Sequence, residues 1–538
     1  MRLASNYRAV IGAVVIALVA ALLVPAASAG ASGAAGRSVP ARSAVGLSAA
    51  GMSTLARSAA GLSAQQRAVL YGIAKDTWKF YAADVDPNTH LPLDNLGPAG
   101  TRGSYTSAAN IGVYLWAVVA ARDLHLIDAR QADAMAAATL RSVSTLKRSS
   151  GFLYQWYDTG TGQVIRNPAD INCAQETVPT QDNCYFLSAV DNGWYASGLI
   201  VARQAMPELR PLIDSLVKPM DFSIFYDNRP QTACNTNPAV PGNQPTGQQY
   251  GGYYVDQGPA GYHNGALYSD PRISMYLGMG LHQMPGDVWW RTWRTLPPKQ
   301  CATDPDFSWQ GQQPAGYWRN IRDPQSGKVF RVWEGHYSYP GTSLSYLPTF
   351  GGGMFEGLMA NEVIPETQWG PRGFGLADLR TAQVQIKYAT DTLHYPVWGL
   401  SPSSTADDTG GYGTFGAEGQ ALPVGQGLSQ CITCATESTV TPHASFLALS
   451  VLPRESYANI QQLRSRYPDS YSADGGFYDA VNPITGAVGH RRLVLDQSMI
   501  MAALDNALNG NALQRYFAQD PTSWAAHAYL SAETLSLR

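Results

Sequence analysis

A set of acidic side chains stands in apolar, aromatic or glycine-rich surroundings, in a chain where only 14% of the residues are charged. Burial among such neighbours makes a carboxyl group costly to ionise and raises its pKa toward the range of a general acid. Two carboxyl groups facing each other can cleave a glycosidic bond, because one protonates the leaving oxygen and the other activates water or attacks directly. The candidates are Asp191, Asp270, Glu334, Glu356, Asp479 and Asp496.

Each of these residues also has a purely structural interpretation. Asp270 directly precedes Pro271 in "YSDPRISMYLGMG", which is the pattern of a helix N-cap followed by proline at the first helical position. In the structural interpretation, Asp191 and Asp496 cap the helices that follow them. Glu334 and Glu356 are then loop or buried hydrogen-bonding groups. For Asp270 we expect both roles, because a helix N-terminus at the mouth of a cleft permits capping and contact with a substrate.

The motifs of several other chemistries are missing from the sequence. It contains no GxSxG, HExxH or P-loop pattern, and its 9 histidines lack the paired spacing of a metal site. We therefore expect neither a metal nor a cofactor, and we place His443 at the start of a helix. A net charge of −3 without clustered Lys and Arg argues against nucleic acid as a partner.

Aromatic residues are plentiful, with 13 Trp, 29 Tyr and 14 Phe. Many Tyr and Trp beside few charges suit a surface that stacks on neutral, hydroxyl-rich ligands, so we expect a neutral polysaccharide or oligosaccharide as substrate. Ordinary packing is the alternative, and about half of the candidates should be core residues. Besides Glu334 and Glu356, the candidates for substrate contacts are Tyr105, Asn110, Trp156, Tyr157, Trp194, Tyr262, His263, Trp333, His336, Tyr337 and Trp398.

The N-terminus has the pattern of a signal peptide. Basic residues precede the apolar run "VIGAVVIALVAALLV", which is short for a membrane span, and an Ala-Ser-Ala cleavage site follows. We assign residues 1–29 to the signal peptide and residues 30–62, rich in Ala, Gly and Ser, to a flexible linker. The mature chain is expected to be extracellular, monomeric and free of the membrane.

The 6 cysteines fit an oxidising compartment. Proximity along the chain predicts the disulfides Cys173–Cys184, Cys234–Cys301 and Cys431–Cys434. The last pair forms "CITC", which is also a redox or zinc pattern, but no second CxxC or histidine pair accompanies it.

Helical periodicity dominates the rest of the chain. Ser63 and Gln66 have capping-box spacing at the start of a first helix. The long loops 219–268 and 400–440 separate later helices and are expected to serve function. The series predicts one all-α domain over residues 63–538, most naturally closed into an α/α toroid with its loops over one end. The further predicted helices span 107–124, 131–146, 189–205, 271–281, 376–392, 442–450, 454–464, 496–508 and 512–518.

Several motifs of the chain are familiar as a set. In order, they are "SYTSAANIGVYLWAVVAARDLHLI", "GFLYQWYDTGTGQV", "SAVDNGWYASGLIVAR", "YSDPRISMYLGMG", "GGGMFEGLMAN", "TPHASFLAL", "GGFYDAVN" and "VLDQSMIMAALDNAL". Together they resemble, over about residues 66–518, the bacterial glycoamylase-like domain, which includes the endo-β-1,2-glucanases of glycoside hydrolase family 144 and relatives acting on cyclic β-1,2-glucans. The resemblance implies an (α/α)6 toroid and inverting hydrolysis by a general acid and a base acting on water.

The resemblance also implies roles for particular residues. It places the general acid on Asp270, where relatives usually carry Glu, and the base on Asp496 or Asp479, and Asp191 resembles an acid near the cleaved bond. Asp is one methylene shorter than Glu, and this difference has three possible consequences: a general acid at a shifted position, a different substrate, or lost activity. The alternatives are a polysaccharide lyase on the same toroid, disfavoured by the few cationic residues, and a glycan-binding protein without catalysis.

Overall fold

The computed structural model describes residues 61–168, 173, 184–229, 247–264, 266–295, 314–349, 351–417 and 438–537. The predicted signal peptide and most of the predicted linker lie outside these residues. So do the predicted disulfides Cys234–Cys301 and Cys431–Cys434. Within the described ranges, every helix is too short or too polar to cross a membrane.

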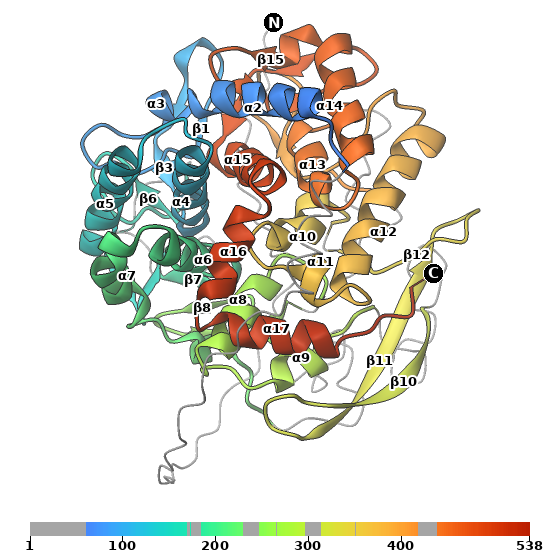
Figure 1. Ribbon diagram of the computed structural model, residues 1–538. Coiled ribbons are helices and arrows are strands. Elements are labelled where there is room, and N and C mark those ends of the chain that lie inside the picture. Colours follow the sequence, from blue (N-terminus) through green and yellow to red (C-terminus); the bar gives the residue numbers. More distant parts are fainter. Residues whose placement is uncertain are drawn as a thin grey trace, which may run out of the picture.

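The helices nearest the centre of the molecule follow one another around a ring (Figure 1). Along this ring α4 packs on α6, α6 on α8, α10 on α13, α13 on α15, and α15 on α4. The remaining step is made by Arg272 of α8, whose guanidinium donates to the carbonyl oxygens of Glu356 (3.3 Å) and Gly357 (2.5 Å) in α10. The ring helices are α4 (Ala108–Asp123), α6 (Ala189–Ala205), α8 (Arg272–Gly280), α10 (Met354–Leu358), α13 (Pro442–Leu447) and α15 (Val494–Leu508).

The sequences of the ring helices explain their central position. All residues of α4 from Ala108 to Ala121 are buried, so this helix is covered on every side. Small residues allow α4 and α6 to approach closely. A Cβ on Gly112 would lie 2.3 Å from the carbonyl oxygen of Trp194, and one on Gly198 would lie 2.2 Å from the carbonyl oxygen of Gly112. Only glycine fits at this crossing.

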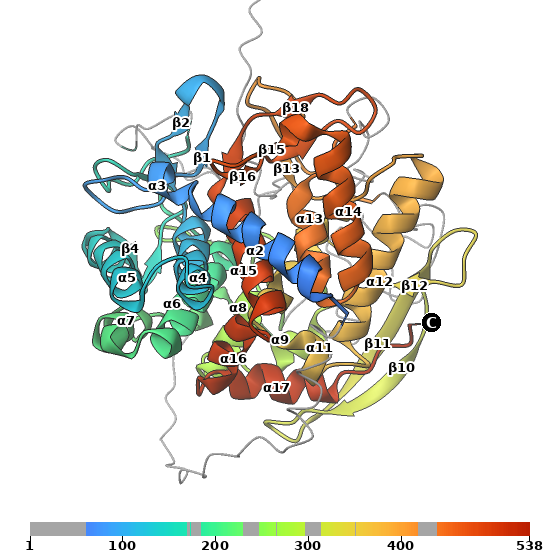
Figure 2. The same cartoon turned by 45° about the horizontal axis from the view of Figure 1, so that its top comes forward.

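A second layer of helices covers the ring from outside (Figures 1 and 2). The outer helix α2 packs on α15 and α4, α5 on α4, α7 on α6, α17 on α8, α12 on α10 and α14 on α13. The predicted capping box at the start of α2 is confirmed, with Ser63 and Gln66 bonded reciprocally at 3.2 and 2.7 Å. The outer and connecting helices are α2 (Ala64–Trp78), α3 (Tyr81–Asp84), α5 (Ala129–Thr145), α7 (Arg210–Val217), α9 (Asp287–Arg291), α11 (Glu366–Trp369), α12 (Phe374–Lys387), α14 (Pro453–Arg466), α16 (Ala512–Gln519) and α17 (Ser523–Ala532).

Every predicted helix is found, with bounds shifted by a few residues. The predicted helix 376–392 is α12 followed by a π-helical turn over Tyr388–Thr392. The prediction missed α7, the short helices α9, α10 and α11, and α17. The apolar composition of α17 has little helical periodicity, because Trp, Ala, Tyr and Leu occupy most of its positions.

Short antiparallel strands lie at the N-terminal ends of ring helices. β3 leads into α4, β7 into α6 and β19 into α15, so these pairings fix where each helix begins. β1 pairs with β19 and thereby joins residue 95 to residue 493. The strands at this end include β1 (Asn95–Leu96), β2 (Arg102–Gly103), β3 (Tyr105–Thr106), β6 (Tyr157–Asp158), β7 (Phe186–Ser188), β8 (Gly252–Tyr254), β9 (Gly258–Pro259), β13 (Ser403–Ser404), β14 (Tyr412–Gly413), β17 (Ala480–Val481), β18 (Val488–Gly489) and β19 (Arg492–Leu493).

A longer hairpin departs from the predicted all-α domain. β10 (Ala315–Arg322) pairs antiparallel with β11 (Val329–Ser338), and the end of β11 pairs antiparallel with β12 (Ser345–Tyr346). Figure 2 shows this hairpin at the edge of the molecule, outside the ring. The fold is nevertheless mostly helical, as predicted. The alternation in "VFRVWEGHYS", with Phe330 and Val332 buried and Val329 and Arg331 exposed, was the available strand signal.

A buried ion pair locks α8 to the segment after α10. The fully buried Arg272 donates two hydrogen bonds of 2.8 Å to Glu366, which also accepts one of 2.6 Å from Tyr276. We expect Arg272→Met to lower the free energy of unfolding by about 3–5 kcal/mol, because Glu366 is left as an unpaired buried charge.

Denaturant unfolding measures this loss. The control is Lys387→Met, which removes an exposed pair with Asp391 and should change stability by less than about 1 kcal/mol. Equal effects of the two substitutions would show that the Arg272 pair is not a structural lock.

Candidate active site

Carboxyl groups and one histidine from several ring helices lie at the end of the ring where the chain enters each helix. The first turn of a helix carries a partial positive charge, which favours acidic side chains there. The residues at these positions are Asp191 in α6, Glu356 in α10, His443 in α13 and Asp496 in α15, with Asp270 two residues before α8.

The first group is formed by Asp270, Glu356 and Asp191. Asp270 and Glu356 are hydrogen-bonded to each other, and Asp270 also bonds Trp194. Ser269 Oγ donates to Glu356 Oε2 at 2.8 Å. Burial raises the pKa of Asp270, and burial together with Asp270 raises the pKa of Glu356 well above its usual value. Two adjacent buried carboxyl groups in this state favour keeping a proton between them.

Asp191 adds a third carboxyl group to this side. Its pKa is raised by burial, and the nearby Asp270 charge raises it further. Its backbone N–H is capped by Ser188 Oγ at 3.2 Å, and Gln155 Nε2 lies 3.4 Å from its Oδ2. The sequence analysis missed Gln155.

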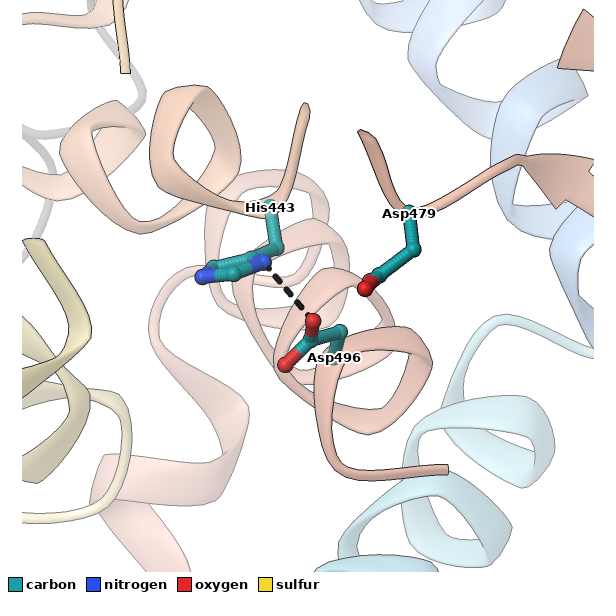
Figure 3. Close-up of side chains that lie close together, drawn as sticks. All are labelled: His443, Asp479 and Asp496. Carbon is teal, nitrogen blue, oxygen red and sulfur yellow. Dashed lines mark ion pairs between the residues drawn. The ribbon is translucent and has the colours of Figure 1, made fainter. Parts of the chain in front are cut away.

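The second group joins His443, Asp479 and Asp496, whose side chains point toward one another from different elements (Figure 3). His443 Nδ1 lies 3.1 Å from Asp496 Oδ2 and 2.8 Å from Thr441 Oγ1. Asp479 Oδ2 accepts a 2.6 Å hydrogen bond from the Ser404 N–H. The placement of His443 at a helix start is confirmed, but the sequence analysis did not connect it to the carboxylates.

The charges of the second group follow from its burial. Burial lowers the pKa of His443 to about 4, so the ring is neutral near pH 7. Burial raises the pKa of Asp496 to about 7. The pKa of Asp479 is raised well above its usual value by burial and by the adjacent Asp496. At neutral pH, Asp479 therefore holds a proton that Asp496 gives up more readily.

The ligand atoms of these three residues lie within 4.8 Å of one another, close enough to share a cation. Their donor set of one imidazole and two carboxylates would suit zinc or another divalent ion. The same geometry suits two carboxyl groups that share a proton. Chelation experiments distinguish these uses.

Tyr412 lies near members of both groups and Asp94 lies near the second group, and the sequence analysis missed both. Tyr412 on β14 is close enough to Asp496, Asp479, Glu356 and Asp94 for their charges, after burial, to raise its pKa well above the usual value. Asp94 Oδ1 accepts a 2.9 Å hydrogen bond from Asn110 Nδ2. "LPLDNLG" does place Asp94 among apolar residues, the signal that singled out the other candidates.

The predicted helix caps are wrong. The side chain of Asp270 makes no capping hydrogen bond to α8, because it bonds Glu356 and Trp194 instead. Asp191 lies inside the first turn of α6, which Ser188 caps, and Asp496 lies inside the first turn of α15. These carboxyl groups are thus free of a capping function.

Several predicted contact residues border the site. Trp194 bonds Asp270, and Asn110 bonds Asp94. Tyr105 is partly exposed, is hydrogen-bonded to Asn95 (3.2 Å), and packs edge-on against Trp156 with ring centroids 5.5 Å apart. Tyr105 therefore borders the site beside Asp94, and the buried Trp156 supports its ring.

Other predicted contact residues serve the fold. Tyr157 is fully buried and its hydroxyl donates to the Lys147 carbonyl (2.6 Å), and Trp398 belongs to the core with its backbone bonded to Asn459. His263 Nε2 lies 2.9 Å from Asp227 Oδ2, and the ring of Tyr262 occupies the space beside Gly251. These positions correct the expectation of sugar contacts for Tyr157 and Trp398.

The contacts recorded for the candidates on β11 are with neighbouring strands and with the C-terminal segment. Glu334 is fully buried and pairs with Arg319 at 2.7 Å, and His336 Nδ1 lies 2.9 Å from Ser536 Oγ. Trp333 packs against Trp318, and Tyr337 against Tyr346. Burial and the neighbouring Glu533 raise the pKa of Glu334 to about 7. The structure thus does not bring Trp333, Glu334, His336 or Tyr337 to the site.

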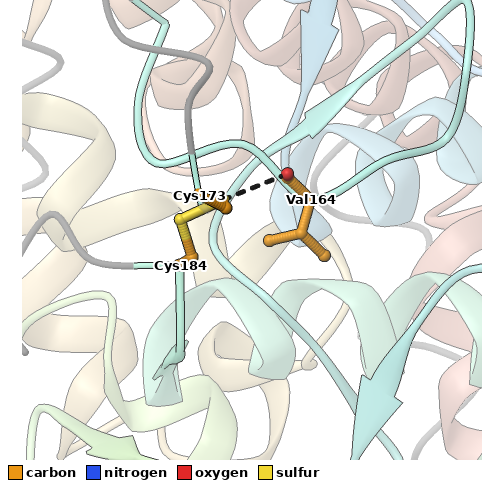
Figure 4. The surroundings of a disulfide bond; sticks show 3 residues. All are labelled: Val164, Cys173 and Cys184. Atoms are coloured by element: carbon orange, nitrogen blue, oxygen red, sulfur yellow. Dashed lines mark hydrogen bonds between the residues drawn. A yellow bond between two sulfur atoms is a disulfide. The ribbon is translucent and has the colours of Figure 1, made fainter. Parts of the chain in front are cut away.

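The predicted disulfide Cys173–Cys184 is confirmed (Figure 4). Cys184 precedes β7, which leads into α6 and Asp191. Cys173 Sγ lies 3.2 Å from the carbonyl oxygen of Val164. The bridge therefore anchors the chain just before the strand that positions Asp191.

Comparisons with known proteins match two stretches of the chain. Residues 337–521 match the family model described as "Putative glucoamylase", and residues 72–250 match "Protein of unknown function (DUF3131)". A stretch of 90 residues is 32% identical to the cyclic β-(1,2)-glucan synthase NdvB of Rhizobium meliloti (strain 1021). This stretch is 16% of the present chain and 3% of that protein.

Solved structures share the fold over most of the chain. A Bacteroides caccae protein described as a putative glucoamylase has a TM-score of 0.60 at 16% identity, covering 86% of this chain and 98% of that one. The endo-β-1,2-glucanase from Chitinophaga pinensis, in complex with sophorotriose and glucose, gives 0.59 at 16%, covering 87% and 98%. The endo-β-1,2-glucanase from Talaromyces funiculosus with sophorose gives 0.58 at 12%, covering 89% and 94%.

The fold is therefore that of glucoamylase-like proteins and endo-β-1,2-glucanases. The resemblance inferred from the motifs is confirmed.

Proposed function

We propose that this protein is a secreted glycoside hydrolase that cleaves a β-glucan, most specifically a β-1,2-glucan, with inversion of configuration. The observation that carries the proposal is the presence of two clusters of acidic residues at one end of the helical ring. One cluster contains Asp270 and the other contains Asp496. Inverting hydrolysis needs an acid and a base on opposite sides of the scissile bond. The glucanases with this fold support a β-1,2-linked substrate.

Asp270 is the general acid in this proposal. Burial raises its pKa, against the opposing effect of the Glu356 and Trp194 hydrogen bonds, and so favours the protonated form that a general acid needs, while its partial exposure leaves it accessible. Trp194 and Glu356 orient its carboxyl group. As the bond from the anomeric carbon to oxygen breaks, the proton passes from Asp270 to the departing sugar hydroxyl.

Asp496 is the base that takes a proton from the attacking water. The hydrogen bond between the two C-terminal aspartates raises the pKa of Asp479 and lowers the pKa of Asp496. Asp496 is therefore the better candidate for a base, because it gives up its proton more readily. The neutral His443 beside it fixes the carboxylate without adding charge. Asp479 therefore positions Asp496 and favours its ionised form.

The test is incubation of the purified protein with β-1,2-, β-1,3- and α-linked glucans and with arabinan, followed by mass spectrometry and early-time NMR. Short β-1,2-glucan oligosaccharides released with inverted configuration, unchanged by EDTA, are the expected result. Loss of activity in EDTA that a divalent cation restores would reassign the His443 group to metal binding. Ultraviolet-absorbing unsaturated products would indicate a lyase, and binding without new reducing ends a glycan-binding protein.

The pH dependence of kcat/KM provides a separate prediction. The base must be ionised, and burial raises the pKa of Asp496 to about 7, so kcat/KM should fall about tenfold per pH unit below pH 7. The acid must be protonated, so activity should fall again at higher pH, above the raised pKa of Asp270. An acid limb near pH 4 would exclude Asp496 as the base.

A further inference from the structure

We propose that His443, Asp479 and Asp496 form a binding site for a divalent cation of the zinc type, and that a bound cation inhibits the enzyme by occupying the base. This inference rests on the proposed function, because it concerns the regulation of the same Asp496. It goes beyond that function, because the hydrolysis itself is expected to need no metal. Spacing along the chain could not reveal such a site, since its ligands come from three separate segments.

The three side chains converge from separate elements. His443 lies at the start of α13, Asp496 in the first turn of α15, and Asp479 just before β17. One ligand atom from each residue lies within 4.8 Å of the other two, and Figure 3 shows the side chains pointing toward one another. Among the residues that the structure describes, these three make up the one such group of His, Cys, Asp or Glu side chains.

Several carboxylate oxygens of this group lack a donor. The residues Asp479 and Asp496 are only 2% and 1% exposed. Outside the group itself, no N–H or hydroxyl donor of the described residues bonds Asp479 Oδ1 or either carboxylate oxygen of Asp496. Buried acceptors without donors are costly, because they have lost their hydrogen bonds to water. A cation bound between the two carboxylates would satisfy these oxygens together.

The histidine of the group presents one ring nitrogen to the same space. His443 is 1% exposed, and its Nδ1 lies 3.1 Å from Asp496 Oδ2. Thr441 Oγ1 lies 2.8 Å from the same nitrogen. A cation at Nδ1 would therefore take the place of the Thr441 hydroxyl as the partner of this nitrogen.

The number and kind of ligands select the class of cation. One imidazole nitrogen and two carboxylate oxygens, with a fourth position left for water, are a ligand set typical of zinc. Calcium takes about six to eight oxygen ligands and magnesium prefers octahedral oxygen coordination, which these three side chains do not provide. Asp94 adds an acidic group near Asp496, and Arg491 acts on Asp94 in the opposite direction.

A bound cation would withdraw the base from the reaction. In the proposed mechanism the carboxylate of Asp496 accepts a proton from the attacking water, and it cannot do so while its lone pairs bind a cation. Saturating zinc should therefore lower kcat by about 10²-fold or more, which is the scale of a general base contribution. Removal of the ion with EDTA should restore the original rate.

Calorimetry of the purified, untagged protein with zinc chloride tests the site without using activity. Wild type should bind one zinc ion, and zinc should raise its Tm, because the ion binds the group only in the folded protein. His443→Asn and Asp479→Asn should each weaken binding by at least about tenfold and lose the shift in Tm. The matched control is His490→Asn, which removes an exposed histidine 3.1 Å from Asp408 and should leave both effects in place.

Hydrolysis of β-1,2-glucan with added zinc tests the inhibition. Loss of activity in wild type and in His490→Asn, reversed by EDTA, is the expected result. Absence of zinc binding, or binding that is lost only in His490→Asn, would overturn the site. Full activity at zinc concentrations that saturate the calorimetric site, or activity that requires the ion, would overturn the inhibition. Zinc binding by a protein that releases no product from any glucan would retain the site and refute the proposed function.

Discussion

Asp270→Asn should lose hydrolysis of unactivated β-1,2-glucan, with kcat lower by about 10²–10⁴-fold. Asparagine keeps the size of the side chain and can still bond Trp194 and Glu356, but it has no proton to give to the leaving oxygen. The loss should therefore fall on kcat, while the affinity for the glucan changes little. Reducing-end assays and binding calorimetry measure the two effects separately.

The chemistry of the leaving group provides the control for this interpretation. An aryl β-glucoside with an acidic phenol needs little protonation, so Asp270→Asn should retain most of its activity on such a substrate. Asp378→Asn is the matched control variant outside the site, because Asp378 is a buried aspartate of the core that accepts a hydrogen bond from Tyr268. If Asp270→Asn hydrolyses unactivated glucan at the wild-type rate, the acid lies elsewhere.

Asp496→Asn should also lose about 10²–10⁴-fold in kcat, and it should gain stability at alkaline pH. The pKa of Asp496 is raised to about 7 in the folded protein, above the value near 3.9 of an unfolded chain. Such a group contributes its stability at low pH and loses it as pH rises through the folded pKa. Above pH 7 the ionised Asp496 costs up to about 4 kcal/mol, part of which the neutral amide recovers.

Thermal unfolding at pH 5 and pH 8 measures this difference. The Tm of Asp496→Asn should exceed that of wild type at pH 8 and approach it at pH 5. Asp505→Asn, at the other end of α15, is the control, because Asp505 is also buried with a raised pKa but lies outside the site. It should keep full activity. Wild-type activity in Asp496→Asn, or an equal loss in Asp505→Asn, would refute the role of Asp496.

The sequence predicted much of the fold because helical information is local. The capping box at Ser63 and the nearly continuous apolar runs of α4, α6 and α15 are readable without knowing their neighbours. The hairpin β10–β11 was missed because its Trp, Tyr and Glu residues resembled a ligand-binding loop. Its alternation of buried and exposed residues is a weak signal, because it extends over a single pair of strands.

The site was predicted in part, for a physical reason. A carboxyl group among apolar residues signals burial, and this signal found Asp191, Asp270, Glu356, Asp479 and Asp496. The same signal selected Glu334, which is buried for structural pairing with Arg319. Sequence cannot separate these cases, because the partner that decides between them lies far along the chain. For the same reason Tyr412 and His443 were not connected to the site.

The pairing of β1 with β19 has a consequence for how this site comes into existence. It places the Val494 N–H 2.9 Å from the carbonyl oxygen of Asp94, two residues about four hundred positions apart. Contacts of such long range form late, because the chain must first give up the entropy of closing the loop between them. The acidic groups at both ends of the domain therefore meet only after the last ring helix has been synthesised and docked. Recovery of activity during refolding should accordingly report ring closure, after most of the helical signal has already returned.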